Sequence, residues 1–512
     1  MKKKFLGVFA VVAATAIGLS GCGAMKDGEW GAPGDWAGSP EWNMGADMFD
    51  GASGNFQYES IVEQGFCDTA EEPSSYFSLD RNTASYSQVR AQINAGYKIA
   101  SDSVRTEEMI NYFDFDYPAP EEGEEMRVSA YLTDCPWNEA HKLATFGIRT
   151  QERALPEDAK NNYVFLLDVS GSMSARVQGL DGMSCFDLVK HGIGVLVNGL
   201  SDSDRVSIVT YASGVKEALE PTLATENGKK DIMKVVNKLE SSGSTYGSGG
   251  INLAYEVAER YYAEGGNNRV ILMTDGDFNV GISNKDKLAE LIKEKAKSGI
   301  YLTVLGVGMG NMNDTIMQTL AMNGNGNYAY IDTPAEAEKA LGSELNGMLV
   351  PVAKDAKAGV TFNADTVSKY RLLGYDMKVM SQEEFEDEEK DAGEIGSNLC
   401  VTAMYELELK EDAEEGASLA EAEVKYKSVE TGENLSKAAE LKYELSESND
   451  LIFASCVMEF GLILRKSEHR GAASLASTLA RLAAISDYLE KDIYKAEFKD
   501  LVQKAIVSEY YE

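Results

Sequence analysis

The sequence predicts an α/β fold with added β-structure: a doubly wound, mostly parallel sheet with helices on both faces, inserted into a β-sandwich-like region. Three observations predict it. The apolar run Tyr163–Leu167 is typical of a strand that is covered on both faces. Amphipathic helical stretches then alternate with short apolar runs as far as residue 349. Segments with the alternation of exposed strands lie on either side of this stretch.

Each element of the central stretch follows from its own pattern. The first helix is recognised by apolar residues at steps of three and four along one face, from Phe186 to Leu200. The further strands are predicted at Val206–Tyr211, Val270–Met273, Ile300–Leu305 and Tyr328–Ile331. The further helices are predicted at Lys229–Leu239, Ile251–Tyr262, Lys285–Lys297, Met312–Met322 and Ala335–Leu349.

The flanks are rich in predicted strands. Before the central stretch, Met126–Asp134 and Lys142–Thr150 alternate as strands do, and a short helix is expected from Thr106, with Thr106 as its cap. Strands are predicted after it at Val360–Phe362, Tyr370–Tyr375, Val401–Leu409, Ala422–Lys427 and Ala438–Leu445. We expect the strands of both flanks to join in one sandwich, with helices from Asp450 onward.

The acidic run Glu383–Lys390 is predicted to be a solvated loop, and an acidic docking patch is the alternative. The whole chain of 512 residues is too long for one hydrophobic core, so several domains are expected. Its formal net charge of −35 repels phosphate backbones and anionic headgroups, which argues against nucleic acid as a partner.

The N-terminus has the features of a lipoprotein signal peptide. Lys2, Lys3 and Lys4 precede an uncharged, mainly apolar run that is shorter than a membrane-spanning helix needs. The run ends in a Leu-Ser-Gly-Cys sequence at Cys22 that looks like a bacterial lipobox. We therefore expect Cys22 to be lipidated and the protein to be anchored on the extracytoplasmic side of a bacterial membrane. An ordinary signal peptide with a chance cysteine is the alternative.

Composition divides the rest of the chain. A glycine-rich tether contains Trp30, Trp36 and Trp42, each after an acidic residue, and is either a plain tether or a recognition segment. The five cysteines after Cys22 form no C-x-x-C pair. We expect either disulfides, which could join Cys67 to Cys135 or Cys400 to Cys456, or free buried thiols. The predicted parts are 1–21 (signal peptide), 22–55 (tether), 56–161 (N-terminal flank), 162–349 (central domain), 350–448 (β-rich region) and 449–512 (helical region).

Oxygen donors gather where the predicted strands of the central domain end. Asp168, Ser170 and Ser172 follow the first strand directly, and Asp275 closes a later buried strand. Thr245 lies in a loop before a helix. Ligands of open α/β sheets bind at the carboxyl ends of strands, and Mg²⁺ prefers oxygen ligands. The sequence therefore predicts a divalent metal site, for Mg²⁺ or else Mn²⁺ or Ca²⁺, whose open position favours an acidic group of a partner.

These five residues resemble the metal-ion-dependent adhesion site of the von Willebrand factor type A (VWA) family, which is D-x-S-x-S with a distant Thr and Asp. The flanks are similar to those of bacterial VWA lipoproteins, in the segments Tyr76–Tyr86, Val104–Pro118, Cys135–Asn138, Tyr370–Tyr375 and Asp391–Gly396. The resemblance implies a metal-dependent module that binds a protein ligand, for adhesion or for assembly of an envelope complex.

Enzyme motifs are missing from the sequence. Ser170 replaces the second aspartate of a dehalogenase-type phosphatase, and Ser172 is outside a G-x-S-x-G frame. Among the three histidines, His191 falls inside a predicted helix and makes a poor candidate for a general base. We therefore expect no enzyme. The alternatives are a metal-dependent hydrolase and a scaffold in which the metal is only structural.

Overall fold

The computed structural model describes residues 56–153, 160–177, 179–180, 182–277, 284–308, 312–344, 347 and 349–508. The predicted signal peptide and tether, with Cys22 and the three tether tryptophans, lie outside these residues. All described residues fall in one unit, Gly51–Glu512. Within them, no helix is both long enough and apolar enough to cross a membrane.

The central sheet has the predicted doubly wound topology. Its strands follow the order β10-β9-β8-β5-β6-β7; all neighbours are parallel except β6 and β7, which are antiparallel. The strands are β5 (Asn162–Asp168), β6 (Arg205–Tyr211), β7 (Val215–Leu223), β8 (Asn268–Thr274), β9 (Tyr301–Val307) and β10 (Tyr328–Ile331).

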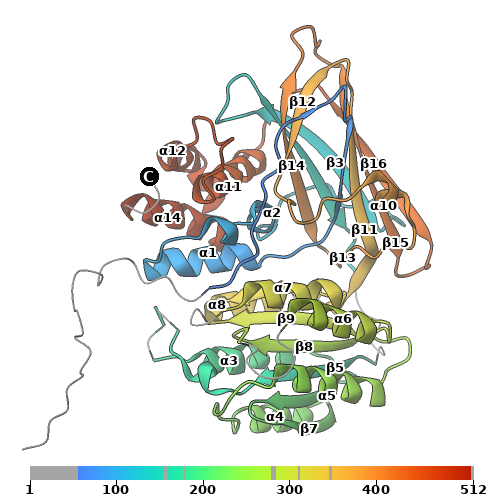
Figure 1. Cartoon of the computed structure of the whole chain (residues 1–512), viewed down its shortest axis with the longest axis vertical. Coiled ribbons are helices and arrows are strands. Elements are labelled where there is room, and N and C mark those ends of the chain that lie inside the picture. The colour runs from blue at the N-terminus through green and yellow to red at the C-terminus, as the bar shows by residue number, and fades with distance from the viewer. Residues whose placement is uncertain are drawn as a thin grey trace, which may run out of the picture. The chain divides into compact units, whose positions relative to one another are not determined.

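Helices cover both faces of this sheet, which explains the continuous apolar run of β5 (Figure 1). Tyr163, Phe165 and Leu167 pack into one core, and Val164 and Leu166 into another on the opposite face. The first core includes α3 (Cys185–Gly199), α4 (Glu226–Val236) and α8 (Pro334–Glu338). The second includes α5 (Gly247–Arg260), α6 (Lys285–Ala296) and α7 (Asp314–Asn323).

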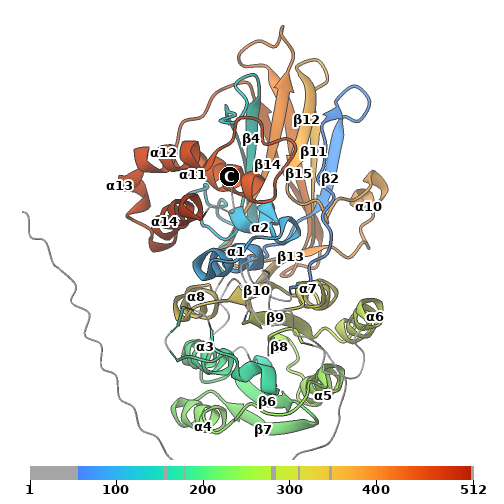
Figure 2. The same cartoon turned by 60° about the vertical axis from the view of Figure 1, so that its left-hand side comes forward.

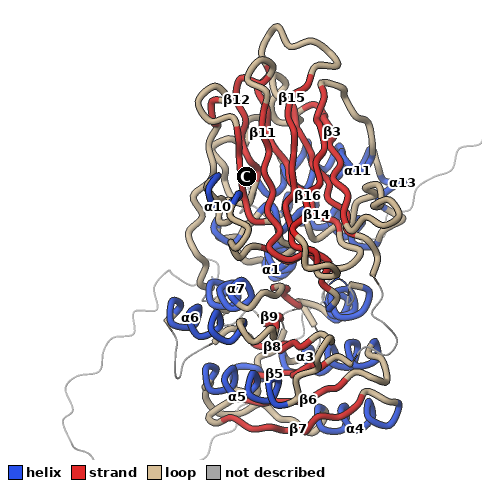
Figure 3. The backbone as a smooth tube through the Cα atoms, turned by 90° about the vertical axis from the view of Figure 1, so that its right-hand side faces the viewer, coloured by secondary structure: helices blue, strands red, loops and turns tan. Residues whose placement is uncertain are grey.

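Two further sheets face each other across a third core (Figure 3). The first has the order β1-β12-β14-β4-β3, with strands Cys67–Asp68, Val367–Leu373, Cys400–Leu409, Lys142–Thr150 and Met126–Asp134. The second has the order β13-β11-β15-β16, with strands Gly393–Gly396, Pro351–Phe362, Ser418–Ser428 and Asn434–Lys442, and β2 (Ser74–Ser78) pairs with β11.

The predicted insertion is confirmed by strand pairing. β4 precedes the central domain and β14 follows it, yet they pair antiparallel from Cys400 with Arg149 to Leu407 with Lys142. β2 and β11 pair across the same insertion. Strands from both flanks therefore build one sandwich.

Helices of both flanks share a fourth core (Figure 2). It joins N-terminal residues such as Tyr86 and Trp137 to C-terminal ones such as Phe453 and Phe498. The N-terminal helices are α1 (Ala84–Ala95), η1 (Ser101–Ser103) and α2 (Thr106–Ile110). The C-terminal helices are α11 (Asn449–Leu464), α12 (Leu475–Ala484), α13 (Ser486–Leu489) and α14 (Ile493–Val507).

Local details differ from the sequence-based predictions. Thr106 is the first helical residue of α2 rather than its cap, and Arg105 takes the cap position without a side-chain bond. The last predicted helix of the central domain is α-helical from Pro334 to Glu338, and Lys339–Ser343 is a π-helical turn. The edge strand β7 was not predicted, because most of its side chains are at least partly exposed and give no apolar run.

Candidate metal centre

Asp168 is fixed at the carboxyl end of β5 by its neighbours. The parallel register sets Leu167 beside Met273 of β8, so that Thr274 follows next to Asp168. One carboxylate oxygen of Asp168 accepts a hydrogen bond from the Thr274 hydroxyl, and the other accepts one from the N–H of Ser170, both at 2.9 Å. The side chain is fully buried. Asp168 is therefore held rigidly where the sequence predicted a ligand.

The two serines and Asp275 lie beside this carboxylate. A 3₁₀ turn, η2 (Gly171–Ser174), follows β5 and carries Ser172. The hydroxyl oxygens of Ser170 and Ser172 are 2.9 Å apart. Burial raises the pKa of Asp275 overall, and a hydrogen bond from the Ser172 hydroxyl to its carboxylate opposes this in part. The structure thus brings these residues together from the ends of two neighbouring strands.

Thr245 reaches the same edge of the sheet through its loop. The N–H of Gly171 donates to the carbonyl of Gly243 at 2.9 Å, and the N–H of Ser242 donates to the carbonyl of Val169 at 2.8 Å. A Cβ on Gly171 would lie only 3.2 Å from the Gly243 carbonyl oxygen, so glycine permits the close approach. Thr245 itself is buried. All five predicted residues therefore belong to three loops that meet at one edge.

The electrostatics of this edge favour a cation. Burial, and next the repulsion of Asp275, raise the pKa of Asp168 to about 6. Burial also raises the pKa of Asp275. The leading causes of both shifts include no basic side chain. Buried carboxylates are costly without a compensating charge, and a bound cation would supply it.

The donor chemistry limits which cation fits. In the described part of the chain, no group of three or more His, Cys, Asp or Glu side chains is arranged to hold a metal. The five residues instead combine two carboxylates with three hydroxyls, an all-oxygen set. Hard cations such as Mg²⁺ prefer such ligands, whereas zinc sites use nitrogen and sulfur.

Comparison with known protein families identifies the central domain. The family model for the von Willebrand factor type A domain matches residues 162–342.

Residues 162–342 are a von Willebrand factor type A domain.

The flanks match family models as well. A second model, described as von Willebrand factor, matches residues 52–145, and the model for the C-terminal region of the uncharacterized protein YfbK matches residues 347–507. The VWA domain and its flanks are thus both recognised, as the resemblance of the sequence implied. VWA domains commonly mediate protein–protein interaction.

Relatives of known sequence cover parts of the chain. The uncharacterized protein YfbK of Escherichia coli is 37% identical over 363 residues, which are 70% of this chain and 62% of that protein. The human inter-alpha-trypsin inhibitor heavy chain H3 is 25% identical over 205 residues, 39% of this chain and 22% of that protein. The chain therefore spans less than two thirds of the length of either relative.

Among solved structures, a von Willebrand factor type A protein from Catenulispora acidiphila is 14% identical. It covers 72% of this chain and 89% of its own, with a TM-score of 0.40.

Two residues of the VWA site were missed by the sequence-based prediction. Thr274 bonds to Asp168, and the Tyr211 side chain lies close to the same carboxylate from the neighbouring strand β6. Thr274 directly precedes Asp275 at the end of β8. Parallel pairing of β8 with β5 places Thr274 beside Asp168. Thr274 could have been found only from the register between β5 and β8, and the sequence alone does not give that register.

Other predicted candidates stay outside the site. The five cysteines of the described residues are free, so neither disulfide pairing forms. The Nε2 atom of His191 lies 3.6 Å from Glu338 of helix α8, on a half-exposed surface.

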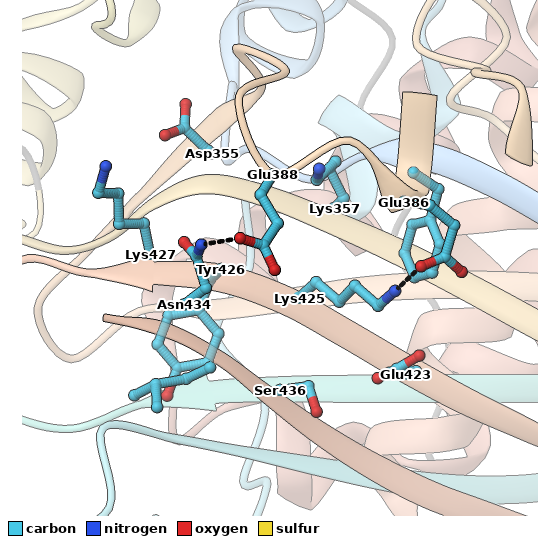
Figure 4. A pocket seen from close by; sticks show the side chains of 12 residues that line it. Asp355, Lys357, Glu386, Glu388, Glu423, Lys425, Tyr426, Lys427, Asn434 and Ser436 are labelled. Carbon is cyan, nitrogen blue, oxygen red and sulfur yellow. Dashed lines mark hydrogen bonds and ion pairs between the residues drawn. The ribbon is translucent and has the colours of Figure 1, made fainter. Parts of the chain in front are cut away.

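A separate pocket of about 200 Å³ lies on the second sandwich sheet, where the acidic run crosses it (Figure 4). The run is not the simple solvated loop that was predicted, because Gln382–Glu386 forms the short helix α10. Its Glu386 pairs with Lys425 at 2.5 Å, and Glu388 accepts a hydrogen bond from Asn434 at 2.8 Å. The acidic run is therefore docked in part on the sandwich of its own chain.

Proposed function

We propose that this chain is a cell-surface lipoprotein that binds a protein partner through a divalent metal ion held in its VWA domain. Asp168, Ser170, Ser172, Thr245 and Asp275 would hold the ion, directly or through water. The observation that carries the proposal is the buried Asp168–Asp275 pair, whose raised pKa values reflect carboxylates that lack a compensating charge. Mg²⁺ is the cation that we expect, with Mn²⁺ or Ca²⁺ as substitutes.

The chemistry of the donors suggests what kind of partner binds. Three of the five side chains are neutral hydroxyls, so Asp168 and Asp275 are the only anionic side chains among the five. A bound ion would offer the remaining position to an acidic side chain of the partner. The residues of this chain would keep that position accessible, since Ser172 and Gly171 are partly exposed while Asp168 and Ser170 are buried.

Anchoring is the second part of the proposal. The lipobox-like sequence before Cys22 supports lipidation at this cysteine and a position on the extracytoplasmic side of the membrane. Cys22→Ser should abolish incorporation of labelled palmitate in cells and release the protein from the membrane fraction. Labelling that persists in this variant would contradict the anchor without affecting the metal site.

The metal proposal is tested by calorimetric titration of the full chain with Mg²⁺ and Mn²⁺. Asp168→Ala and Thr245→Ala should weaken binding at least about 100-fold, more than the loss of a residue that only supports a ligand costs. Ser174→Ala is the matched control, because Ser174 belongs to the same turn and its hydroxyl donates to the carbonyl of Gly171. Saturable binding that Asp168→Ala leaves intact would overturn the proposal.

The same variants separate binding from the two alternatives. Capture of a partner from envelope extract should be lost with a chelator and with Asp168→Ala, although both proteins stay folded. A metal that only stabilises the fold would raise the unfolding midpoint and leave capture unchanged. Metal-dependent cleavage of phosphoesters or peptides that Asp168→Ala abolishes would instead favour a hydrolase.

A further inference from the structure

A segment outside the VWA domain runs directly to the loop behind the metal site. We name residues 56–68 the N-terminal strap. It ends in β1 (Cys67–Asp68), the first strand of the sandwich, and near its start Phe56 and Tyr58 pack against the core on one face of the VWA sheet. Gln57 lies between them and is exposed. The strap therefore places the solvent-facing Gln57 on the VWA domain, although the strap precedes that domain in the sequence by about 100 residues.

Gln57 is bonded to the VWA loop at three points. Its N–H donates to the carbonyl of Met312 at 3.1 Å, and its carbonyl accepts from the N–H of Thr315 at 3.4 Å. Its side-chain oxygen accepts from the Asn313 side-chain amide at 2.9 Å. The strap thus pairs with residues 312–315 like a short added strand.

Asn313 joins this contact to the start of helix α7. Its side-chain oxygen accepts from the N–H of Ile316 at 3.1 Å and so caps the helix. Its amide nitrogen is the atom that bonds to Gln57. One side chain therefore uses its acceptor for the helix and its donor for the strap, and the two bonds together fix its orientation.

The backbone of Asn313 also lies against the loop that carries Asp275. A Cβ on Gly276 would lie 3.0 Å from the nitrogen and 3.4 Å from the oxygen of Asn313. Gly276 has a φ of 82°, which favours glycine, and it follows the candidate ligand Asp275 directly. Movement of Asn313 would thus be transmitted to the backbone next to Asp275.

We infer that Gln57 is a positioning residue of the metal site: it holds Asn313 against Gly276 and thereby sets the backbone that presents Asp275. The affinity of the VWA domain for its metal then depends on the N-terminal strap, a segment outside the domain. This inference rests on the proposed function, because it requires that the site binds a metal.

Other contacts of the strap should keep it attached when the bond from Asn313 to Gln57 is removed, which makes the inference testable. The Tyr58 hydroxyl accepts from Gln92 at 3.1 Å, the N–H of Ile61 donates to Asp102 at 3.1 Å, and Glu63 pairs with Arg371 at 3.1 Å. Loss of an exposed side chain such as Gln57 changes protein stability little. A change in metal affinity would therefore report on position rather than on unfolding.

The test is calorimetric titration of the full chain with Mg²⁺ alone. Gln57→Met keeps the length of the side chain and removes its acceptor, and we expect it to weaken metal binding roughly 3- to 10-fold, the worth of one hydrogen bond. Gln57→Glu keeps an acceptor oxygen and should bind at least as tightly as the unchanged chain. Ser60→Ala, at another exposed position of the strap, is the matched control.

A double-mutant cycle separates this role from a general effect. Asn313→Ser keeps a good helix cap and removes the amide that bonds to Gln57. If the pair acts together, Gln57→Met should add little to the effect of Asn313→Ser on metal affinity. Thermal unfolding without metal should be unchanged in Gln57→Met.

The outcomes distinguish the two proposals. If the unchanged chain binds Mg²⁺ and Asp168→Ala does not, while Gln57→Met binds as tightly as the unchanged chain, the positioning role is wrong and the metal site stands. Additive effects in the cycle would also overturn the positioning role. If the unchanged chain does not bind metal, the proposed function fails first.

Discussion

Arg90 in helix α1 and Asp332, directly after strand β10 of the VWA sheet, form a double ion pair with both side chains buried. The Nε atom of Arg90 lies 2.9 Å from one carboxylate oxygen and an Nη atom lies 2.5 Å from the other. The same guanidinium contacts Glu336 of helix α8 at 2.6 Å. Helix α1 belongs to the N-terminal flank, so this pair joins the flank to the VWA domain.

Arg90→Ala should lower the free energy of unfolding by about 3–5 kcal/mol, because it leaves the buried carboxylates of Asp332 and Glu336 without their partner. Urea denaturation at pH 7 measures the change. Arg260→Ala is the control, since the pairs of Arg260 with Glu217 and Glu256 lie at the surface, where water and salt screen them and they stabilise the fold little. Equal losses in the two variants would contradict a structural role for the buried pair.

Gly276→Ala should impair metal binding as well as stability. Its φ of 82° costs a side chain about 1–2 kcal/mol, and the new Cβ would also meet Asn313. Gly265 is a matched control, since its φ is 73° but a Cβ there has no neighbour within 4 Å. Thermal unfolding and Mg²⁺ titration of both variants check this. A similar loss of metal affinity in both would refute a specific role for the contact with Asn313.

Glu344 should make stability depend on pH in the acid range. Burial opposes its ionisation, but Arg81 at 3.0 Å and Lys339 at 2.5 Å lower its pKa from the ordinary 4.5 to about 2. The folded pKa lies below the unfolded one, so its stabilisation is fully present above about pH 5 and is lost as the pH falls toward 2.

Glu344→Gln should therefore destabilise the protein by roughly 1–2 kcal/mol at pH 7, and the difference from the unchanged chain should shrink between pH 4.5 and pH 2. Urea denaturation at several pH values measures it. Glu226→Gln removes an exposed carboxylate and controls for the change in net charge. A difference that is constant down to pH 2 would show that Glu344 is not responsible.

The cysteines should react slowly in the folded protein. Cys135, Cys185, Cys400 and Cys456 are buried, and burial raises the pKa of Cys135, Cys185 and Cys456 to about 12, so few thiolates exist at pH 8. In a Cys22→Ser background, a thiol reagent should modify the half-buried Cys67 first and all five only after unfolding. Reductant should leave the unfolding midpoint unchanged, and a lower midpoint would reveal a disulfide.

Much of the VWA domain could be predicted from the sequence because its signals are local. The strand Tyr163–Leu167 is apolar at every position, since both of its faces are covered. Asp168, Ser170 and Ser172 follow it directly, and Asp275 follows β8 in the same way. Parallel strands end at one edge, so the meeting of these residues followed from the order of elements alone.

Features with no local signal were missed or only hypothesised. The edge strand β7 alternates poorly because it is exposed, and the docking of the acidic run depends on Lys425 and Asn434, which lie beyond it in the sequence. The pairing of β4 with β14 could be proposed from strand-like patterns, but not its register.

The sequence by itself determined the central α/β domain and its doubly wound sheet, because apolar runs and helical periodicity are local signals, and it predicted the five oxygen-bearing residues in the loops of this domain. Only the tertiary structure decided that Thr274 holds Asp168, that Gln57 reaches Asn313, and that Arg90 meets Asp332. These contacts join residues between 106 and 256 positions apart in the chain, and such distances are closed only by packing of the whole fold.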